Sequence, residues 1–223
     1  MEIGDINRKL TLFHGSKCGL QGAIRPMSDG ACDFGSGFYM GDEPRQPKTL
    51  ICESRLPVFY TLQLDFEGLR VLDFEPDADW ALFVAYNRGR LRKYDDSALC
   101  RRYKRIRSEY DGISGRIADD RMFAVMTMFF QGLIGVPALV ESLSALNMGR
   151  QYCAVTEKAC ANVTVVQEQR FSDSEIGTLR FENNERRKAG SEAAERICQR
   201  LRREGESFFE LIERVVQRGE EKP

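Results

Sequence analysis

The segment Leu10-Thr11-Leu12-Phe13-His14-Gly15-Ser16 is a short apolar and β-branched run that ends in a histidine, a glycine and a serine. Such a run favours a strand, so we expect a strand that delivers His14 at its end. Further runs of this kind occupy residues 58–64, 70–74, 153–156 and 163–167. They alternate with helical patterns at residues 79–87 and 122–146, in no regular strand–helix–strand order. This arrangement predicts an α+β domain rather than a doubly wound parallel sheet.

The composition is that of a globular protein with a sizeable core. The chain has 223 residues, of which 42% are hydrophobic and 30% charged, and its formal net charge is -1. This balance excludes a uniformly basic or acidic protein, so a partner held by charge needs a local patch. The start, MEIGDINRKL, lacks the apolar stretch of a secretion signal, and the seven cysteines lack tight spacing. We therefore expect a cytoplasmic protein with reduced thiols.

The chain contains a single histidine, His14, and this excludes several kinds of site. Zinc sites with two or three histidine ligands cannot form, and the sequence has no CxxC pair, so we expect no metal. A Ser-His-Asp or Cys-His site would have to use His14. Any chemistry must proceed with this one imidazole, unless His14 is a structural histidine.

Residues 122–140 carry no charge, which makes them the nearest approach to a membrane span. Polar and helix-breaking residues interrupt the stretch, namely Thr127, Gln131, Gly132, Gly135 and Pro137. We therefore interpret it as a buried helix from residue 122 to 131, a turn, and a second helix to about residue 146. No membrane partner is expected.

A basic segment precedes this helical pair. Residues 88–107 carry nine Lys or Arg and only Asp95 and Asp96 as acids. Tyr94 and Tyr103 lie among these charges, so a phosphate-rich partner with stacked bases is one interpretation. The solvated face of a helix is the other, because Tyr103 and Ile106 recur at helical spacing.

The chain beyond residue 168 differs in character. Residues 182–223 contain ten acids and ten bases around apolar residues at three- and four-residue steps, which predicts an amphipathic helix that Gly205 bends or divides. We assign residues 1–168 to the main domain and residues 169–223 to a helical C-terminal extension. The apolar stripe of the extension packs either on its own chain or on a neutralising or target protein.

Residues 33–40, DFGSGFYM, contain two glycines one residue apart and then an aromatic pair. Gly35 and Gly37 let the backbone approach a ligand closely, and Phe38 and Tyr39 offer a stacking surface. On its own, the same pattern also fits a tight turn beside core aromatics.

Three blocks together resemble a known family: HGS at residues 14–16, FGSGFYMGD at residues 34–42 and QYCAVT at residues 151–156. Their series resembles the signature of the ADP-ribosyltransferases of the diphtheria-toxin and poly(ADP-ribose) polymerase type, and looks most similar to a bacterial branch. The segment YDGISGRIADDR at residues 110–121 is similar too, so the resemblance covers roughly residues 10–165. It implies a split antiparallel β-sandwich with flanking helices that binds NAD in a cleft.

The resemblance also implies roles for single residues. His14 would hydrogen-bond the adenosine ribose of NAD, and the backbone of Gly15 would hold the nicotinamide amide, with Ser16 as its hydrogen-bonding neighbour. Tyr39 would stack on the nicotinamide ring. Gln151 falls where the polymerases place a catalytic glutamate. NAD would be a substrate, with Gly37 and Phe38 beside its site.

Two positions depart from the family pattern. Eleven residues after Tyr39, where the polymerases carry a second tyrosine, this chain has Leu50, which still offers an apolar wall. Gln151 can hydrogen-bond a ribose hydroxyl but brings no negative charge to an oxocarbenium ion. A full charge at about 4 Å would contribute roughly 4 kcal/mol.

Another carboxylate would have to replace this charge. Asp119 and Asp120 follow an apolar and glycine-rich run that would bring them to the rim of a cleft, and Arg121 is available for a phosphate. The same residues also fit an ordinary helix start that caps the helix near Met122.

The resemblance thus implies an NAD-dependent mono-ADP-ribosyltransferase, a glycosyltransferase that passes ADP-ribose to a protein or nucleic acid, as toxins and effectors do. Nicotinamide is a cationic leaving group in NAD, so its departure needs no proton donor and one histidine is enough. Two alternatives stay open: a degenerate member that binds NAD without turnover, and a partner- or nucleic-acid-binding module that uses residues 88–107 and the terminal helix.

Overall fold

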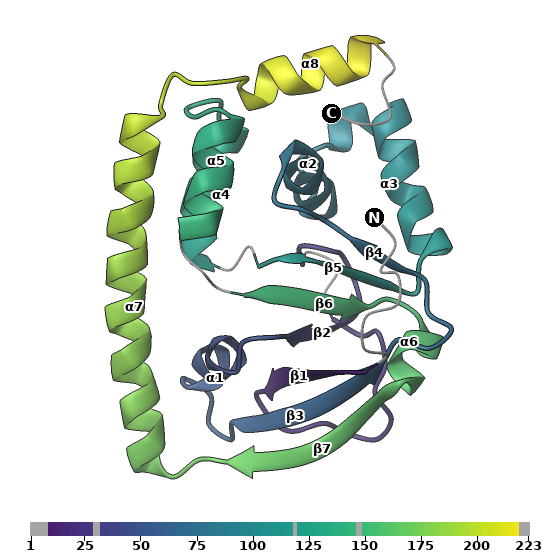
Figure 1. Cartoon of the computed structure of the whole chain (residues 1–223), viewed down its shortest axis with the longest axis vertical. Coiled ribbons are helices and arrows are strands. Elements are labelled where there is room, and N and C mark those ends of the chain that lie inside the picture. Colours follow the sequence, from purple (N-terminus) through teal and green to yellow (C-terminus); the bar gives the residue numbers. More distant parts are fainter. Residues whose placement is uncertain (1–8, 29–31, 118–119, 146–148, 219–223) are drawn as a thin grey trace.

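The computed structural model describes residues 9–28, 32–117, 120–145 and 149–218. Figure 1 shows a sheet through the middle, helices over one half of it, and a long helix along one side. The strands are β1 (Lys9–Ser16), β2 (Phe38–Gly41), β3 (Val58–Asp65), β4 (Val71–Asp73), β5 (Gly112–Arg116), β6 (Arg150–Ala154) and β7 (Val163–Arg170). The α-helices are α1 (Arg45–Ile51), α2 (Ala78–Asn87), α3 (Ala98–Glu109), α4 (Asp120–Phe130), α5 (Val136–Ala145), α6 (Glu157–Ala161), α7 (Asp173–Arg200) and α8 (Phe208–Arg218). A short 3-10 helix covers Arg92–Tyr94.

The strands form one sheet in the order β4-β5-β6-β2-β1-β3-β7. β4 and β5 are parallel, and every other neighbouring pair is antiparallel. β1 pairs with β3 along its whole length, but it pairs with β2 only through Phe13 and Gly41. The sheet is therefore nearly divided into a half β4-β5-β6-β2 and a half β1-β3-β7. His14–Ser16, at the end of β1, lies beyond the single pair that joins them.

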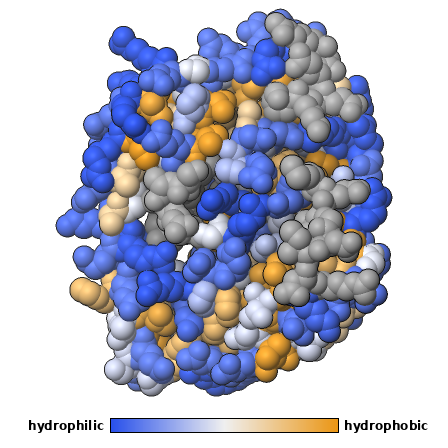
Figure 2. Space-filling view, viewed as in Figure 1, coloured by the Kyte–Doolittle hydropathy of each residue, from blue (hydrophilic) through white to orange (hydrophobic). Residues whose placement is uncertain are grey.

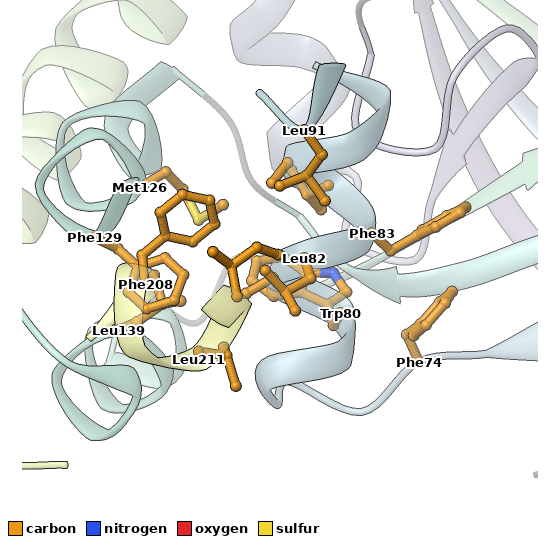
Figure 3. Close-up of a cluster of buried hydrophobic side chains, with 14 of the residues drawn as sticks. Phe74, Trp80, Leu82, Phe83, Leu91, Met126, Phe129, Leu139, Phe208 and Leu211 are labelled. Carbon is orange, nitrogen blue, oxygen red and sulfur yellow. The ribbon is translucent and has the colours of Figure 1, made fainter. Parts of the chain in front are cut away.

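The larger core lies between the half β4-β5-β6-β2 and the helices. Asp77 caps the N-terminus of α2, because its carboxylate accepts a hydrogen bond from the Trp80 backbone N–H, and the apolar run of this helix then packs inward. Figure 3 shows the side chains of Trp80 and Leu82 beside Phe129 of α4 and Phe208 of α8. A second core cluster, around β1 and β3, contains Leu12, Phe38, Met40, Val58, Tyr60, Leu62 and Leu64.

The C-terminal residues form two helices that pack on the rest of the chain. A capping box of Ser172 and Glu175 begins α7, which then runs along the side of the molecule against α1, α4 and α5 (Figure 1). Gly205, with a φ of +71°, lies in the turn that divides α7 from α8. One apolar stripe along these helices is buried in the larger core, and its buried residues are Ala194, Cys198, Leu201, Phe208, Leu211, Ile212 and Val215. The apolar stripe is therefore covered by its own chain.

The α+β class predicted from the sequence is confirmed. The predicted strands at residues 10–13, 58–64, 70–74 and 163–167 correspond to β1, β3, β4 and β7, and the predicted helices to α2, α4 and α5. The strand predicted at residues 153–156 lies earlier, as β6, because Thr156 instead caps α6 by accepting from the Ala159 N–H. The amphipathic helix predicted from residue 182 begins earlier, at Asp173.

Polar side chains dominate the face drawn in Figure 2, and the hydrophobic ones gather in patches between them. Among the described residues, the exposed apolar side chains include Met27, Leu50, Val166 and Phe181. In the described part of the chain no helix combines the length and the apolar character that crossing a membrane requires.

Candidate functional site

An open cleft of about 560 Å³ lies where the two halves of the sheet meet. His14 and Gly15 of β1, Tyr39 of β2 and Gln151 of β6 line it, and Leu50 of α1 lies on its wall. The strand order explains this meeting, because β2 is hydrogen-bonded to β6 on one side and to β1 on the other. Residues that stand far apart in the sequence thus share one cavity.

His14 is held in one orientation. Its Nδ1 lies 2.8 Å from the backbone oxygen of Tyr39, and the Phe38 ring lies 4.5 Å from the imidazole, centroid to centroid. Because a carbonyl oxygen only accepts, Nδ1 carries the hydrogen, and Nε2 of the neutral ring is an acceptor. Burial lowers the pKa of His14, and the hydrogen bond to Tyr39 opposes that shift only in part. The imidazole is therefore neutral at neutral pH and offers an acceptor nitrogen.

The Tyr39 ring is fixed through its hydroxyl group. This hydroxyl donates to the Gly35 oxygen at 2.7 Å and accepts from the Phe34 backbone N–H at 2.9 Å. Burial raises the pKa of Tyr39 far above its usual range, so the phenol stays protonated. Tyr39 is suited to present a rigid aromatic surface to a ligand and unsuited to act as an acid or a base.

Arg107 of α3 supports the turn that holds Tyr39. Its Nη1 donates to the Phe34 oxygen at 2.7 Å and its Nη2 to the Ser36 oxygen at 2.6 Å. Gly35 has a φ of +76°, and a Cβ there would lie 2.4 Å from Arg107 Nη1. The glycine therefore permits this support.

Arg102, also in the basic segment, forms an ion pair with Asp79 of α2 at 2.5 Å, and Arg88 forms one with Asp33 at 2.6 Å. The structure places the Arg102, Arg107 and Arg88 guanidinium groups in contacts within the protein. α3 agrees with the helical interpretation of this segment, since Tyr103 and Ile106 are buried.

Gln151 has a partner that the sequence analysis missed. Its Nε2 donates to the Asp33 carboxylate at 2.8 Å and to the Arg116 backbone oxygen at 3.1 Å. Asp33 is only 5% exposed, lines the cleft, and accepts from Arg88 Nε at 2.9 Å and Nη2 at 2.6 Å. The sequence places Asp33 at the start of DFGSGFYM, but its contact with a residue 118 positions away has no local signal.

Comparison with known proteins identifies a family. The family described as "Protein of unknown function (DUF3990)" matches residues 10–165. The chain belongs to this family. No curated protein and no solved structure matches it.

The remaining predicted residues of this DUF3990 chain differ in their places. A Cβ on Gly15 would lie 2.4 Å from the Pro47 oxygen, so the glycine lets α1 pack against β1. Ser16 is not among the residues that line the cleft, and its Oγ lies 3.5 Å from the Cys18 N–H. Gly37 faces β6 instead, where an added Cβ would lie 2.2 Å from Cys153 Sγ. Phe38 is buried, with its ring against the His14 imidazole, and does not line the cleft either.

The acidic substitutes proposed from the sequence have side chains outside the part of the chain that the structure describes. Asp119 lies outside the described residues, and Asp120 and Arg121 belong to the first turn of α4 with side chains that are not described. Among the described residues that line the cleft, Asp33 is the one with a carboxylate side chain. No cluster of three or more His, Cys, Asp or Glu suited to a metal occurs in the described part of this DUF3990 chain.

Proposed function

We propose that the protein is a cytoplasmic mono-ADP-ribosyltransferase that cleaves NAD and transfers ADP-ribose to a macromolecule, in the manner of a toxin or effector. One observation carries the proposal: His14 and Tyr39, from two separate strands, line one cleft and are joined by a 2.8 Å hydrogen bond. The near division of the sheet between β2 and β1 supports a split ADP-ribosyltransferase-like fold, because the cleft opens at that division.

The reaction places modest demands on the protein. The bond between the ribose C1′ and the nicotinamide nitrogen breaks, and nicotinamide leaves as a neutral molecule with the electron pair. A nucleophile of the acceptor then bonds to C1′ and releases its proton to water. The barrier is the positive charge that develops on the ribose, so orientation and hydrogen bonding of the dinucleotide supply the catalysis.

The geometry supports a role for each residue of the cleft. Nε2 of His14 would accept a hydrogen bond from a hydroxyl of the adenosine ribose, and the backbone of Gly15 would hold the nicotinamide amide. The fixed ring of Tyr39 would stack on nicotinamide, with Leu50, which is 53% exposed, as the facing apolar wall. Gln151 would contact the nicotinamide ribose.

Incubation of the purified protein with NAD and cell lysates tests this function. We expect nicotinamide release and a mass gain of one ADP-ribose on an acceptor, both lost in His14→Ala and in Tyr39→Ala. Tyr39→Phe keeps the ring and should retain part of the activity. Phe181→Ala is the matched control, because that ring on α7 is 69% exposed and outside the cleft. Absence of both products in every lysate would refute the enzyme.

Binding of NAD without turnover is the second candidate, and the amide of Gln151 in place of a carboxylate favours it. Calorimetry separates the two, because a pure binder gives the heat of binding with no slow heat of reaction. A nucleic-acid-binding module would behave differently again: its affinity would fall steeply with salt and would not change in His14→Ala.

A further inference from the structure

The strongest unexplained feature of the cleft is a buried carboxylate, Asp33, that the proposed reaction does not use. It lies within hydrogen-bond distance of an arginine and of an amide, each of which also lines the cleft. Arg88 approaches Oδ1 through two nitrogen atoms, and Gln151 Nε2 approaches Oδ2. The carboxylate thus connects Arg88 on one side with Gln151 on the other, and Gln151 stands at the position where the poly(ADP-ribose) polymerases have a catalytic glutamate.

This bridge decides which atom Gln151 presents. An amide nitrogen has two hydrogens, and both of those on Gln151 Nε2 are used, one by Asp33 and one by the Arg116 carbonyl. Both partners are oxygen atoms that only accept here, so a flipped amide would place two acceptors against each other. Gln151 Oε1 has no protein partner among the described residues and is not among their buried unpartnered atoms. Oε1 is therefore the atom through which Gln151 meets the cleft.

We propose that Asp33 is a positioning residue that locks the Gln151 amide so that Oε1 faces the cleft as an acceptor for a ribose hydroxyl of the bound dinucleotide. The proposal rests on the function given above. Arg88 already compensates the charge of Asp33 within the protein. An electrostatic role for Asp33 opposite a ribose cation is accordingly weaker than the orienting role.

Single variants should disturb this lock in opposite ways. In Asp33→Asn, the new carbonyl oxygen can stay with Arg88, which turns the new NH2 group toward Gln151 Nε2. Two donors then face each other, and turning the Gln151 amide over relieves this contact only by placing Oε1 against the Arg116 carbonyl oxygen, so the amide is no longer held with Oε1 toward the cleft. In Gln151→Glu, a carboxylate faces the carboxylate of Asp33. This substitution alone should therefore lower kcat and Tm, even though it introduces the glutamate that the poly(ADP-ribose) polymerases have at this position.

The double variant Asp33→Asn/Gln151→Glu exchanges donor and acceptor across the contact. The NH2 group of residue 33 can donate to the carboxylate at residue 151, and the second carboxylate oxygen is left to accept in the cleft. We expect each single variant to lower kcat for nicotinamide release about tenfold or more, the effect of one lost substrate hydrogen bond. The double variant should recover part of that loss and part of the fall in Tm, because the contact with residue 33 is restored while the carboxylate oxygen that replaces Nε2 still faces the Arg116 carbonyl oxygen.

Asp79→Asn is the matched control, because Asp79 is also a poorly exposed aspartate paired with an arginine but is not among the residues that line the cleft. It should lower Tm without lowering kcat. If wild type turns over NAD and Asp33→Asn behaves like Asp79→Asn, the positioning role is wrong and the function stands. If wild type neither binds nor cleaves NAD, the proposed function is wrong. The Tm values of the single and double variants at residues 33 and 151 then still test whether Asp33 fixes the Gln151 amide. Additive Tm losses at residues 33 and 151 would overturn it.

Discussion

The two halves of the sheet differ in what covers them and in what they bring to the cleft. The half β4-β5-β6-β2 lies under a layer of helices (Figure 1) and borders the larger core. The half β1-β3-β7 ends in β7, where Val166 is 63% exposed. Each half contributes to the cleft: β2 and β6 supply Tyr39 and Gln151, and β1 supplies His14. The half under the helices therefore borders the larger core, and the cleft is shaped by both halves together.

The largest effect is expected where the C-terminal helices close the larger core. Phe208 is 4% exposed, and its ring centroid lies 5.6 Å from that of Phe129 and 5.4 Å from that of Phe130. Phe208→Ala should lower the free energy of unfolding by about 3–5 kcal/mol through the cavity that it leaves. Val166→Ala, on exposed β7, should change it by no more than about 0.5 kcal/mol. If urea denaturation gave equal losses of unfolding free energy for Phe208→Ala and Val166→Ala, the two halves would not differ in their contribution to stability.

A smaller effect is expected where α1 packs on β1. A Cβ on Gly15 would lie 2.4 Å from the Pro47 oxygen and 2.9 Å from Ile51 Cγ2, so Gly15→Ala must move α1 and with it Leu50 on the cleft wall. We expect a loss of about 1–3 kcal/mol in unfolding free energy and weaker NAD binding by calorimetry. NAD affinity equal to that of wild type would mean that α1 does not shape the site.

The sequence could predict the elements of this molecule better than its contacts. The apolar runs in β1, β3 and α2 gave the class because hydrophobic periodicity is local. Ser172 and Glu175 form the capping box of α7, and their spacing in the sequence is a local signal that places the start of this helix before residue 182.

The residues of the candidate site also differ in whether the sequence alone could identify them. His14 and Tyr39 carry motifs and could be selected from the sequence, whereas the contact of Asp33 with Gln151 depends on β6 lying next to β2. Gly37 shows the opposite case, because its spacing fitted both a ligand contact and a tight turn, and the structure uses it for packing on Cys153. Such tertiary contacts leave no spacing pattern in one sequence.

The pH dependence of stability reports on the burial of His14 near the end of β1. Burial lowers the pKa of His14 below its ordinary value of 6.5, so the unfolded chain takes up a proton at a pH where the folded chain does not. The stability held by neutral His14 is therefore complete above pH 6.5 and declines as the pH falls toward the folded-state pKa. Urea unfolding between pH 8 and pH 5 should show this decline in wild type and less of it in His14→Asn, whose amide can still donate to the Tyr39 oxygen. Parallel curves for both proteins would count against a buried, neutral imidazole.

The smallest effect is expected on the outer surface of α7, which joins the two halves along their side. Gly177 is exposed within the helix and an added Cβ meets nothing within 4 Å, so Gly177→Ala should raise the free energy of unfolding by about 0.5–1 kcal/mol. Gly205→Ala is the contrasting variant, because there φ is +71° and the Cβ would lie 2.4 Å from Pro137 Cδ. It should lower stability, since the turn that directs α8 onto the core would be strained. A gain at both glycines in urea denaturation would show that this turn is not fixed, and the closure of the helical half by α8 would then need another explanation.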